Sequence, residues 1–309
     1  MSIVIVTGGT GMIGRAVITQ LLERGYEVVV FTRDRSLLQH TEQRIRYAYW
    51  NIKTGEVDHK VLEAADYIIH LAGASLMEQR WSARRKKEIV DSRVQSGVLL
   101  SENLLKRPHR LKAFISASAI GWYGQDPEVP NPAPFREDQP AASDFLGNCC
   151  MQWEQSIASL AASGIRVVYL RTGIVLAPHG GVMQQFERAL KWRIAAVPGN
   201  GCQVVSWIHI DDLVTLYLTA MENGSYHGAY NAAAPLPVSN AVLTEALATH
   251  KYGRSFITLP VPAPLLKLVM GEMGAEALKS TTVSAAKVLS HGFRFRYPDI
   301  DTALAQLIK

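Results

Sequence analysis

Residues 3–14 read Ile-Val-Ile-Val-Thr-Gly-Gly-Thr-Gly-Met-Ile-Gly, and this stretch decides the fold class. The apolar run 3–7 has the length of a strand and helical spacing follows over 15–24, so we predict a strand, a glycine turn and a helix. In such a turn Gly8 permits the tight bend, Gly11 lets the backbone approach a pyrophosphate, and Gly14 lets helix and strand pack closely. The helix N-terminus adds unpaired N–H groups and a positive dipole end, which predicts a dinucleotide site. A glycine-rich turn without a ligand is the alternative. The phosphate contacts are expected from Gly8, Gly11, Met12, Ile13 and Gly14.

Apolar, β-branched runs alternate with helical patterns along the rest of the first half. Strands are expected at 28–32, 67–71, 113–118 and 167–171, and helices at 84–106 and 149–162. This alternation predicts an α/β fold, a doubly wound parallel sheet of the Rossmann type.

The pattern loosens after about residue 173, where prolines and glycines mark loops and only a short strand at 207–210 returns. From Pro235 onward the predicted helices are short and bounded by prolines. We therefore expect a Rossmann domain over 1–233, of which 174–205 contributes to a substrate cleft. A smaller C-terminal α/β domain over 234–309 is expected to cap that cleft.

The composition describes a folded chain without unusual segments. Hydrophobic residues make up 48% and charged residues 19% of 309 residues, which predicts a sizeable core. The one basic cluster, Arg84–Lys87, fits a solvated helix face better than a nucleic-acid site. The three cysteines show neither disulfide nor metal spacing, and no run reaches about 18 apolar residues. The first residues show no basic region followed by a long apolar run, so no secretory leader is expected. We expect a soluble cytoplasmic protein with no metal, no membrane and no nucleic-acid partner.

The end of the second predicted strand bears on the choice of cofactor. A site that prefers NAD carries an Asp or Glu there, which holds the ribose 2′-hydroxyl. Here the strand ends in Thr32-Arg33 without an acid, and Asp34 comes one residue too late. An arginine just after the strand can pair with a 2′-phosphate in a fork geometry. We therefore predict NADP(H) rather than NAD, with an ordinary exposed arginine as the alternative.

Further motifs follow the later strands in a fixed order. They are His70-Leu71-Ala72-Gly73, Ile115-Ser116-Ala117-Ser118-Ala119, Tyr123-Gly124, Gly199-Asn200-Gly201-Cys202-Gln203 and Trp207-Ile208-His209-Ile210-Asp211-Asp212-Leu213. With the glycine turn, this ordered set resembles the extended short-chain dehydrogenase/reductase superfamily, which includes nucleotide-sugar epimerases and dehydratases. The resemblance spans nearly the whole chain. It implies a nicotinamide cofactor and a small-molecule substrate, which in the wider superfamily is a nucleotide sugar. It also implies that the chain could form a homodimer.

A narrower set of residues is similar to one atypical subgroup of that superfamily. The set comprises Arg80-Trp81, Lys87, Ile89, Ser92-Arg93, Trp153-Glu154, Leu170-Arg171-Thr172-Gly173 and Ser206-Trp207-Ile208-His209. It resembles the epimerase family proteins of the YfcH type. The resemblance implies NADP(H) contacts at Thr32, Arg33, Leu71, Ala72, Gly73, Glu88, Arg93 and near Ile174. A carboxylate such as that of Glu88 would have to hold a ribose hydroxyl, because it would repel phosphates.

The catalytic pattern that the superfamily resemblance implies is broken in this chain. The superfamily uses a Tyr-x-x-x-Lys pair on one helix, with a Ser or Thr at the end of the strand that corresponds to 113–118 here, where Ser118 stands. Counting back from Trp153-Glu154 puts Leu146 in the tyrosine position and Cys150 in the lysine position. Positioned acid–base catalysis is worth about 10²–10⁴-fold, so this loss would cripple the standard mechanism.

Two functions therefore stay open. The first is an NADP(H)-dependent oxidoreductase or epimerase-like enzyme that acts on a nucleotide-sugar-like or small carbonyl or hydroxyl substrate. Ser118 would then hold the substrate oxygen and Tyr123 would be the substitute proton donor, unless Tyr123 only packs at the base of its loop. The second is a non-catalytic sensor or regulatory protein that binds NADP(H). His209, although it lies beside two aspartates, is interpreted as scaffold.

Overall fold

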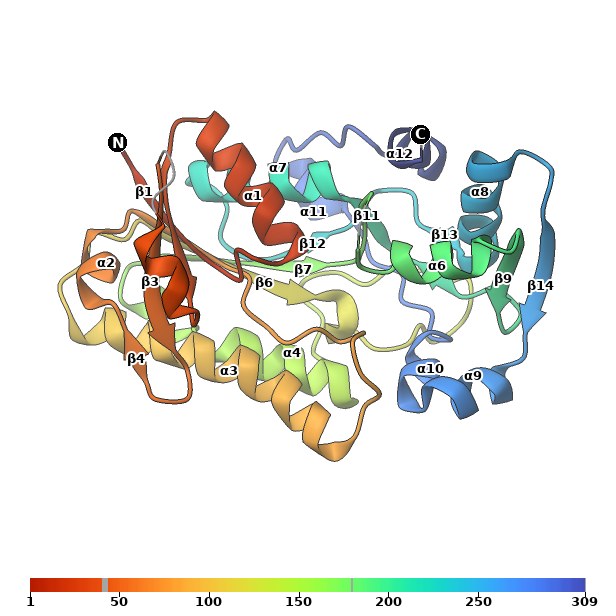
Figure 1. Ribbon diagram of the computed structural model, residues 1–309, viewed down its shortest axis with the longest axis horizontal. Helices are drawn as coiled ribbons and strands as arrows, with labels where there is room; N and C mark the ends of the chain where they lie inside the picture. The colour runs from red at the N-terminus through yellow and green to blue at the C-terminus, as the bar shows by residue number, and fades with distance from the viewer. Residues whose placement is uncertain (41–43, 179, 309) are drawn as a thin grey trace.

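The computed structural model describes residues 1–40, 44–178 and 180–308, and its centre is one large sheet (Figure 1). The strands of this sheet are β1 (Ile3–Thr7), β2 (Glu27–Thr32), β3 (Ile45–Asn51), β4 (Glu56–Val57), β5 (Tyr67–His70), β6 (Ala113–Ala119), β7 (Arg166–Thr172) and β12 (Gly228–Ala232). Their order is β12-β7-β6-β5-β1-β2-β3-β4, and every neighbouring pair is parallel except β3 with β4. The predicted doubly wound sheet is confirmed. The order reverses between β1 and β5, where such sheets open a ligand crevice.

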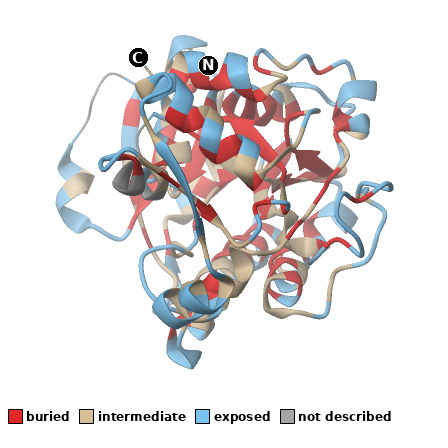
Figure 2. Ribbon diagram, turned by 90° about the vertical axis from the view of Figure 1, so that its right-hand side faces the viewer, coloured by how far each residue is buried: buried red, intermediate tan, exposed pale blue. Residues whose placement is uncertain are grey.

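Helices cover both faces of the sheet (Figure 1). One face carries α1 (Met12–Glu23) and α7 (Ile210–Glu222), and the other carries α2 (His59–Ala64), α3 (Ala83–Lys106), α4 (Phe145–Gln155) and α5 (Ser159–Ala162). Successive strand residues point to opposite cores, because Val4 and Val6 pack with α1 and α7 whereas Ile5 packs with α3 and α5. Burial on both faces explains the continuous apolar runs of the sequence, and Figure 2 shows it concentrated in the sheet. No helix in the described ranges is long and apolar enough to cross a membrane.

Several elements of the Rossmann part differ from the sequence prediction, among them two strands of the parallel sheet. The strands β3 and β12 were not predicted: β3 mixes exposed and buried side chains, and β12 reads Gly-Ala-Tyr-Asn-Ala without a branched residue. The predicted helix 149–162 is two helices, α4 and α5. The first begins earlier than expected because the Asp144 carboxylate caps it, accepting a hydrogen bond from Gly147 N at 2.8 Å.

The later part of the chain consists of short helices and strands. They are β8 (Ile174–Leu176), α6 (Met183–Leu190), β9 (Ile194–Pro198), β10 (Val204–Val205), β11 (Trp207–His209), β13 (Val238–Ser239), α8 (Asn240–Tyr252), β14 (Ile257–Val261), α9 (Ala263–Met270), α10 (Glu272–Glu276), α11 (Ala286–Ser290) and α12 (Ile300–Leu307). The strands pair as β8–β11, β9–β14 and β10–β13. Leu176, Trp207, Leu243 and Leu304 share one core, so elements of segment 174–207 pack against α8 and α12. The division into domains at 233 and 234 stays a prediction.

The segment 280–297 runs back onto the Rossmann part. The buried Asp126 carboxylate accepts hydrogen bonds from Ser280 Oγ at 2.7 Å and from Thr282 N and Oγ1 at 2.9 and 2.7 Å. The Asp212 carboxylate of α7 accepts from the N–H groups of Arg296 and Tyr297 at 2.8 and 3.0 Å. Because each carboxylate is buried and satisfied by the returning segment, this segment is fixed to the large sheet.

Candidate cofactor and substrate site

The β1–α1 turn has the geometry that its glycines predict. Gly8 has φ +69°, and a Cβ there would lie 2.7 Å from Leu71 O. A Cβ on Gly14 would lie 2.3 Å from Gly8 O, so α1 can approach β1 this closely only with glycine. No side chain caps the first turn of α1 and no acidic residue lies in it. Its N–H groups therefore face the crevice between β1 and β5, where a phosphate would satisfy them.

The three charged residues that follow β2, Arg33, Asp34 and Arg35, have different surroundings. Arg33 is exposed directly after the strand. Asp34 turns back on its own chain, where its carboxylate accepts from Ser36 N at 2.9 Å and from Ser36 Oγ at 2.6 Å. These hydrogen bonds lower the pKa of Asp34 and cap the 3₁₀ helix η1 (Arg35–Gln39). The guanidinium of Arg35 stacks on the Tyr49 ring at 4.0 Å. Arg33 is thus exposed at the end of β2, and its contact with a ribose substituent stays a prediction.

A buried histidine joins β1, β5 and α3 beneath the turn. Thr7 Oγ1 accepts from the N–H groups of Leu71 and Ala72 at 3.1 and 3.2 Å, so its hydroxyl donates to His70 Nδ1 at 2.8 Å. His70 Nε2 then carries the proton and donates to Ser96 Oγ at 3.1 Å. This chain of hydrogen bonds needs a neutral imidazole, and it fixes the backbone on which the cofactor motif stands.

The neutral His70 predicts acid sensitivity. Burial lowers the pKa of His70 to about 3 from its ordinary 6.5. Between these values the unfolded chain binds a proton that the folded chain does not, so stability falls as the pH drops below 6.5, by about 1.4 kcal/mol per pH unit. Urea unfolding of the wild type and of His70→Asn at pH 7.5 and 5.5 measures this. We expect the wild type to lose about 1.4 kcal/mol more than the variant, and equal losses would contradict the assignment.

The loop after β5 rests on Arg93 of α3. Arg93 donates to Ala74 O and to Ile89 O, both at 3.0 Å, and its guanidinium lies 5.1 Å from the centre of the Trp153 ring. A Cβ on Gly73 would lie 3.1 Å from the Arg93 guanidinium carbon. Arg93, Leu71, Ala72 and Gly73 are therefore brought together at the end of β5. The structure thus gathers one part of the predicted cofactor set.

Two other residues predicted to contact the cofactor, Glu88 and Ile174, lie away from this group. Glu88 is exposed, and its carboxylate accepts a hydrogen bond from Arg85 at 2.9 Å on the same helix. Ile174 opens β8 and donates its N–H to Ser206 O at 2.9 Å. The loop after β8 then approaches the first turn of α1, because a Cβ on Gly181 would lie 3.4 Å from Met12 Cε. That loop therefore bounds the crevice, while the carboxylate of Glu88 is used within α3.

Ser118 and Tyr123 belong to one buried polar network. Ser118 Oγ donates to Glu154 Oε1 at 2.7 Å. The Glu154 carboxylate receives Nε and Nη2 of Arg171 at 2.9 and 3.0 Å. Tyr123 Oη accepts from Arg171 at 3.0 Å and donates to Asn231 Oδ1 at 2.7 Å, and burial raises the pKa of Tyr123 to about 12. Both hydroxyl groups proposed for catalysis are thus bonded to protein partners.

The two substituted catalytic positions lie on α4 as the counting predicts. Leu146 packs against Gly121 of the 3₁₀ helix η2 (Ile120–Trp122), where a Cβ would lie 3.1 Å from Leu146 Cβ. Cys150 is buried with its Sγ 3.6 Å from Ala119 O, and burial raises the pKa of this thiol to about 12. Neither side chain can exchange a proton at neutral pH.

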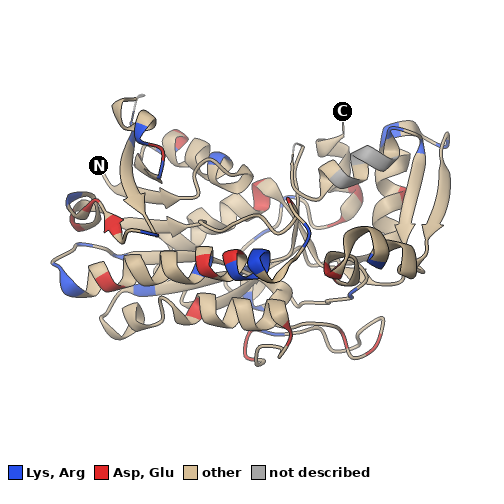
Figure 3. Ribbon diagram, turned by 60° about the horizontal axis from the view of Figure 1, so that its bottom comes forward, with Lys and Arg blue, Asp and Glu red and all other residues tan. Residues whose placement is uncertain are grey.

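The start of α3 and the loop before it contact the C-terminal helices. Arg80 donates to the carbonyl groups of Leu268, at 2.9 Å, and of Val269 at the end of α9. Lys86 forms an ion pair with Glu272 at the start of α10. Figure 3 shows the basic residues gathered where α3 begins, with acidic residues close by. These contacts hold α9 and α10 against the cofactor side of the molecule.

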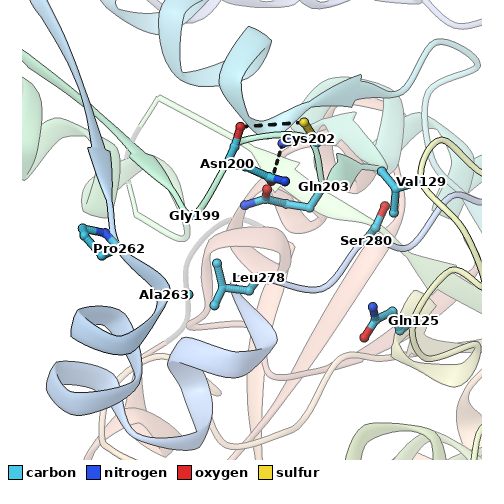
Figure 4. A pocket seen from close by; sticks show the side chains of 10 residues that line it. All are labelled: Gln125, Val129, Gly199, Asn200, Cys202, Gln203, Pro262, Ala263, Leu278 and Ser280. Carbon is cyan, nitrogen blue, oxygen red and sulfur yellow. Dashed lines mark hydrogen bonds between the residues drawn. The ribbon is translucent and has the colours of Figure 1, made fainter.

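A pocket of about 630 Å³ lies between the loop after η2 and the C-terminal elements (Figure 4). It is lined by Gln125, Val129, Gly199, Asn200, Cys202, Gln203, Pro262, Ala263, Leu278 and Ser280. The sequence analysis noted 199–203 as a family motif but did not identify these residues as a lining. The run Gly-Asn-Gly-Cys-Gln, which alternates glycine with polar side chains, was the available signal.

Within the described ranges, no group of three His, Cys, Asp or Glu is placed to hold a metal ion.

Comparisons with known proteins agree with this architecture. The profile of the NAD dependent epimerase/dehydratase family matches residues 4–233, and that of a domain of unknown function, DUF1731, matches 261–307. An epimerase family protein of Staphylococcus aureus (strain NCTC 8325) is 33% identical, over 99% of this chain and 98% of its own. The structure of human epimerase family protein SDR39U1 with NADPH covers 99% of both chains, with 27% identity and a TM-score of 0.84. A nucleoside-diphosphate sugar epimerase of Corynebacterium glutamicum is 30% identical with a TM-score of 0.78, over 99% of this chain and 58% of its own. The resemblance found in the sequence is confirmed.

Proposed function

This chain belongs to the NAD dependent epimerase/dehydratase family, and we propose that it is an NADP(H)-dependent oxidoreductase or epimerase-like enzyme for a hydroxyl or carbonyl compound. The observation that carries the proposal is the β1–α1 turn. There Gly8 and Gly14 allow a close approach that a Cβ would block, and the uncapped N-terminus of α1 faces the crevice. The NADPH in the human relative supports the same cofactor class.

Arg33 supports NADP(H) as the preferred form. A guanidinium bonded to a 2′-phosphate contributes about 1.5–3 kcal/mol, so Arg33→Ala should weaken NADPH binding about 10- to 100-fold and leave NADH binding nearly unchanged. Titration of both cofactors, followed by their fluorescence, measures this. Arg35→Ala is the matched control, because Arg35 is also exposed but stacks on Tyr49. Equal affinity of the wild type for NADPH and NADH would contradict the assignment.

When bound, NADPH supplies a hydride that a carbonyl carbon can accept. The chain must then provide a path for the proton that the carbonyl oxygen takes up. Leu146 and Cys150 provide none, and the hydroxyl groups of Ser118 and Tyr123 are already bonded to Glu154 and Asn231. We therefore propose that this proton comes from water in the open pocket, which implies slow turnover.

The test of the proposal is turnover with bound NADPH. Single-turnover loss of the reduced-nicotinamide absorbance with a panel of aldehydes and ketones is expected, at rates that Ser118→Ala and Tyr123→Phe change less than tenfold, since positioned acid–base groups contribute about 10²–10⁴-fold. A larger loss in a variant that still binds NADPH would return the acid–base role to that residue.

A sensor or regulatory protein is the second candidate, and one observation favours it. The network of Ser118, Glu154, Arg171 and Tyr123 is internally satisfied, as in a structural core rather than an active site. NADPH binding without oxidation by any carbonyl compound of the panel would support this candidate.

A further inference from the structure

The pocket of about 630 Å³ has a lining without charge. Its ten residues include no lysine, arginine, histidine, aspartate or glutamate. Its volume is within the range of about 300–1,000 Å³ typical of small-molecule sites. A nucleoside diphosphate carries at least two negative charges, which proteins hold with arginine, lysine or a helix N-terminus. The described lining offers no such cation.

The polar groups of the lining are carboxamides instead. Gln203 is only 6% exposed, and its Nε2 donates to Pro198 O at 3.0 Å, which leaves Oε1 as an acceptor. Asn200 Oδ1 accepts from Cys202 N at 3.0 Å, which leaves Nδ2 as a donor. Figure 4 shows Asn200, Cys202 and Gln203 together on one side of the pocket, with Gln125 apart from them. These groups offer neutral donors and acceptors, and the lining adds the apolar side chains of Pro262, Ala263 and Leu278 on one side and of Val129 on the other.

The charged groups that bond to Ser280 and Lys279, together with Lys279 itself, carry a net negative charge. Ser280 of the lining donates to the Asp126 carboxylate at 2.7 Å, and no cation contacts Asp126 among the described residues. Lys279, which follows Leu278, is paired with Asp144 at 2.8 Å and with Glu276 at 2.6 Å. Three carboxylates thus stand against one ammonium group. A field of this sign raises the free energy of a bound phosphate.

We infer that this pocket takes an uncharged compound with amide, hydroxyl or carbonyl groups and excludes nucleoside diphosphates. The inference rests on the proposed function, because it assigns the substrate of that proposed reaction to this pocket. The inferred substrate class differs from the one in the name of the Corynebacterium glutamicum relative, a nucleoside-diphosphate sugar epimerase. The polar atoms of the substrate would meet Gln125, Asn200 and Gln203, and its apolar part would meet Leu278 and Ala263.

Cys202 allows the field in the pocket to be measured without knowing the substrate. It is the exposed cysteine of the three, whereas Cys149 and Cys150 are buried with thiol pKa values raised by burial. Its rate of modification is compared for three methanethiosulfonate reagents, which carry a trimethylammonium, a hydroxyl or a sulfonate group, with the same rates for free cysteine. The reagent ratio is the rate of the cationic reagent divided by the rate of the anionic one. We expect this ratio to be about five to ten times larger for Cys202 than for free cysteine. Cys202→Ser confirms the site of labelling.

A second measurement uses UDP-glucose as the probe. With NADPH present, 1 mM UDP-glucose (about the upper end of ordinary KM values) should leave the labelling rate of Cys202 unchanged. Val129→Arg, at a position that is 43% exposed, places a cation on the rim and should bring the reagent ratio close to that of free cysteine. A wild-type ratio equal to that of free cysteine, no effect of Val129→Arg, or protection by UDP-glucose would each overturn the inference. Failure of NADPH to bind, followed separately by fluorescence, would instead remove the proposed function.

Discussion

Replacing Arg171 by alanine is expected to lower the free energy of unfolding by about 3–5 kcal/mol. The guanidinium is held between the Glu154 carboxylate, Tyr123 Oη and Glu137 O, and it lies 3.6 Å from the centre of the Trp122 ring. The side chains of Arg171 and Glu154 are only 4% and 10% exposed. Removing one partner leaves a buried carboxylate without its counter-ion, and the loss should appear as a lower midpoint in urea.

The matched control for this variant is Arg24→Ala. Arg24 pairs with Glu222 at 2.7 Å, but both side chains are 36% exposed. An ion pair of this kind contributes about 0–1 kcal/mol. A loss for Arg171→Ala as small as that for Arg24→Ala would show that the network carries no stability.

The second large effect is expected for Gly8→Ala. The new Cβ would lie 2.7 Å from Leu71 O on a backbone with φ +69°, so the turn must move away from β5. A charge-assisted hydrogen bond contributes about 1.5–3 kcal/mol, so we expect NADPH binding to weaken about 10- to 100-fold for each phosphate hydrogen bond that the moved turn loses. Fluorescence titration measures it, and circular dichroism checks that the fold is kept.

Gly55→Ala separates backbone strain from the clash. Gly55 has a similar φ of +71°, but a Cβ there meets nothing within 4 Å. It should cost about 1–2 kcal/mol of stability and leave cofactor binding unchanged. If Gly8→Ala bound NADPH as tightly as Gly55→Ala does, the phosphates would not lie at this turn.

The fold class could be predicted because the information was local. The strand, glycine turn and helix of residues 3–23 are contiguous, and each glycine acts on atoms within that unit or on the neighbouring β5. The strands β3 and β12 were missed because their stability comes from their neighbours in the sheet rather than from branched residues of their own. Local sequence therefore predicted the centre of the sheet better than its margins.

The candidate site shows where sequence alone stops. Ser118 and Tyr123 were placed correctly at and beyond the end of β6, but their partners Glu154, Arg171 and Asn231 come from three other elements. Only the tertiary contacts show that both hydroxyl groups are already bonded. The pocket was missed for the same reason, since Gln125, Cys202 and Ser280 are far apart in the chain.

The returning segment 280–297 has a consequence for synthesis of the chain. Asp126 precedes Ser280 by 154 positions and Thr282 by 156. At about 5–20 residues per second, a ribosome needs on the order of ten seconds or more to deliver these partners. During that interval we expect the Asp126 carboxylate to stay hydrated and the loop that carries it to stay open. The nascent Rossmann part would therefore stay incompletely packed around Asp126. The pocket side that contains Ser280 would form only when translation nears the last segment.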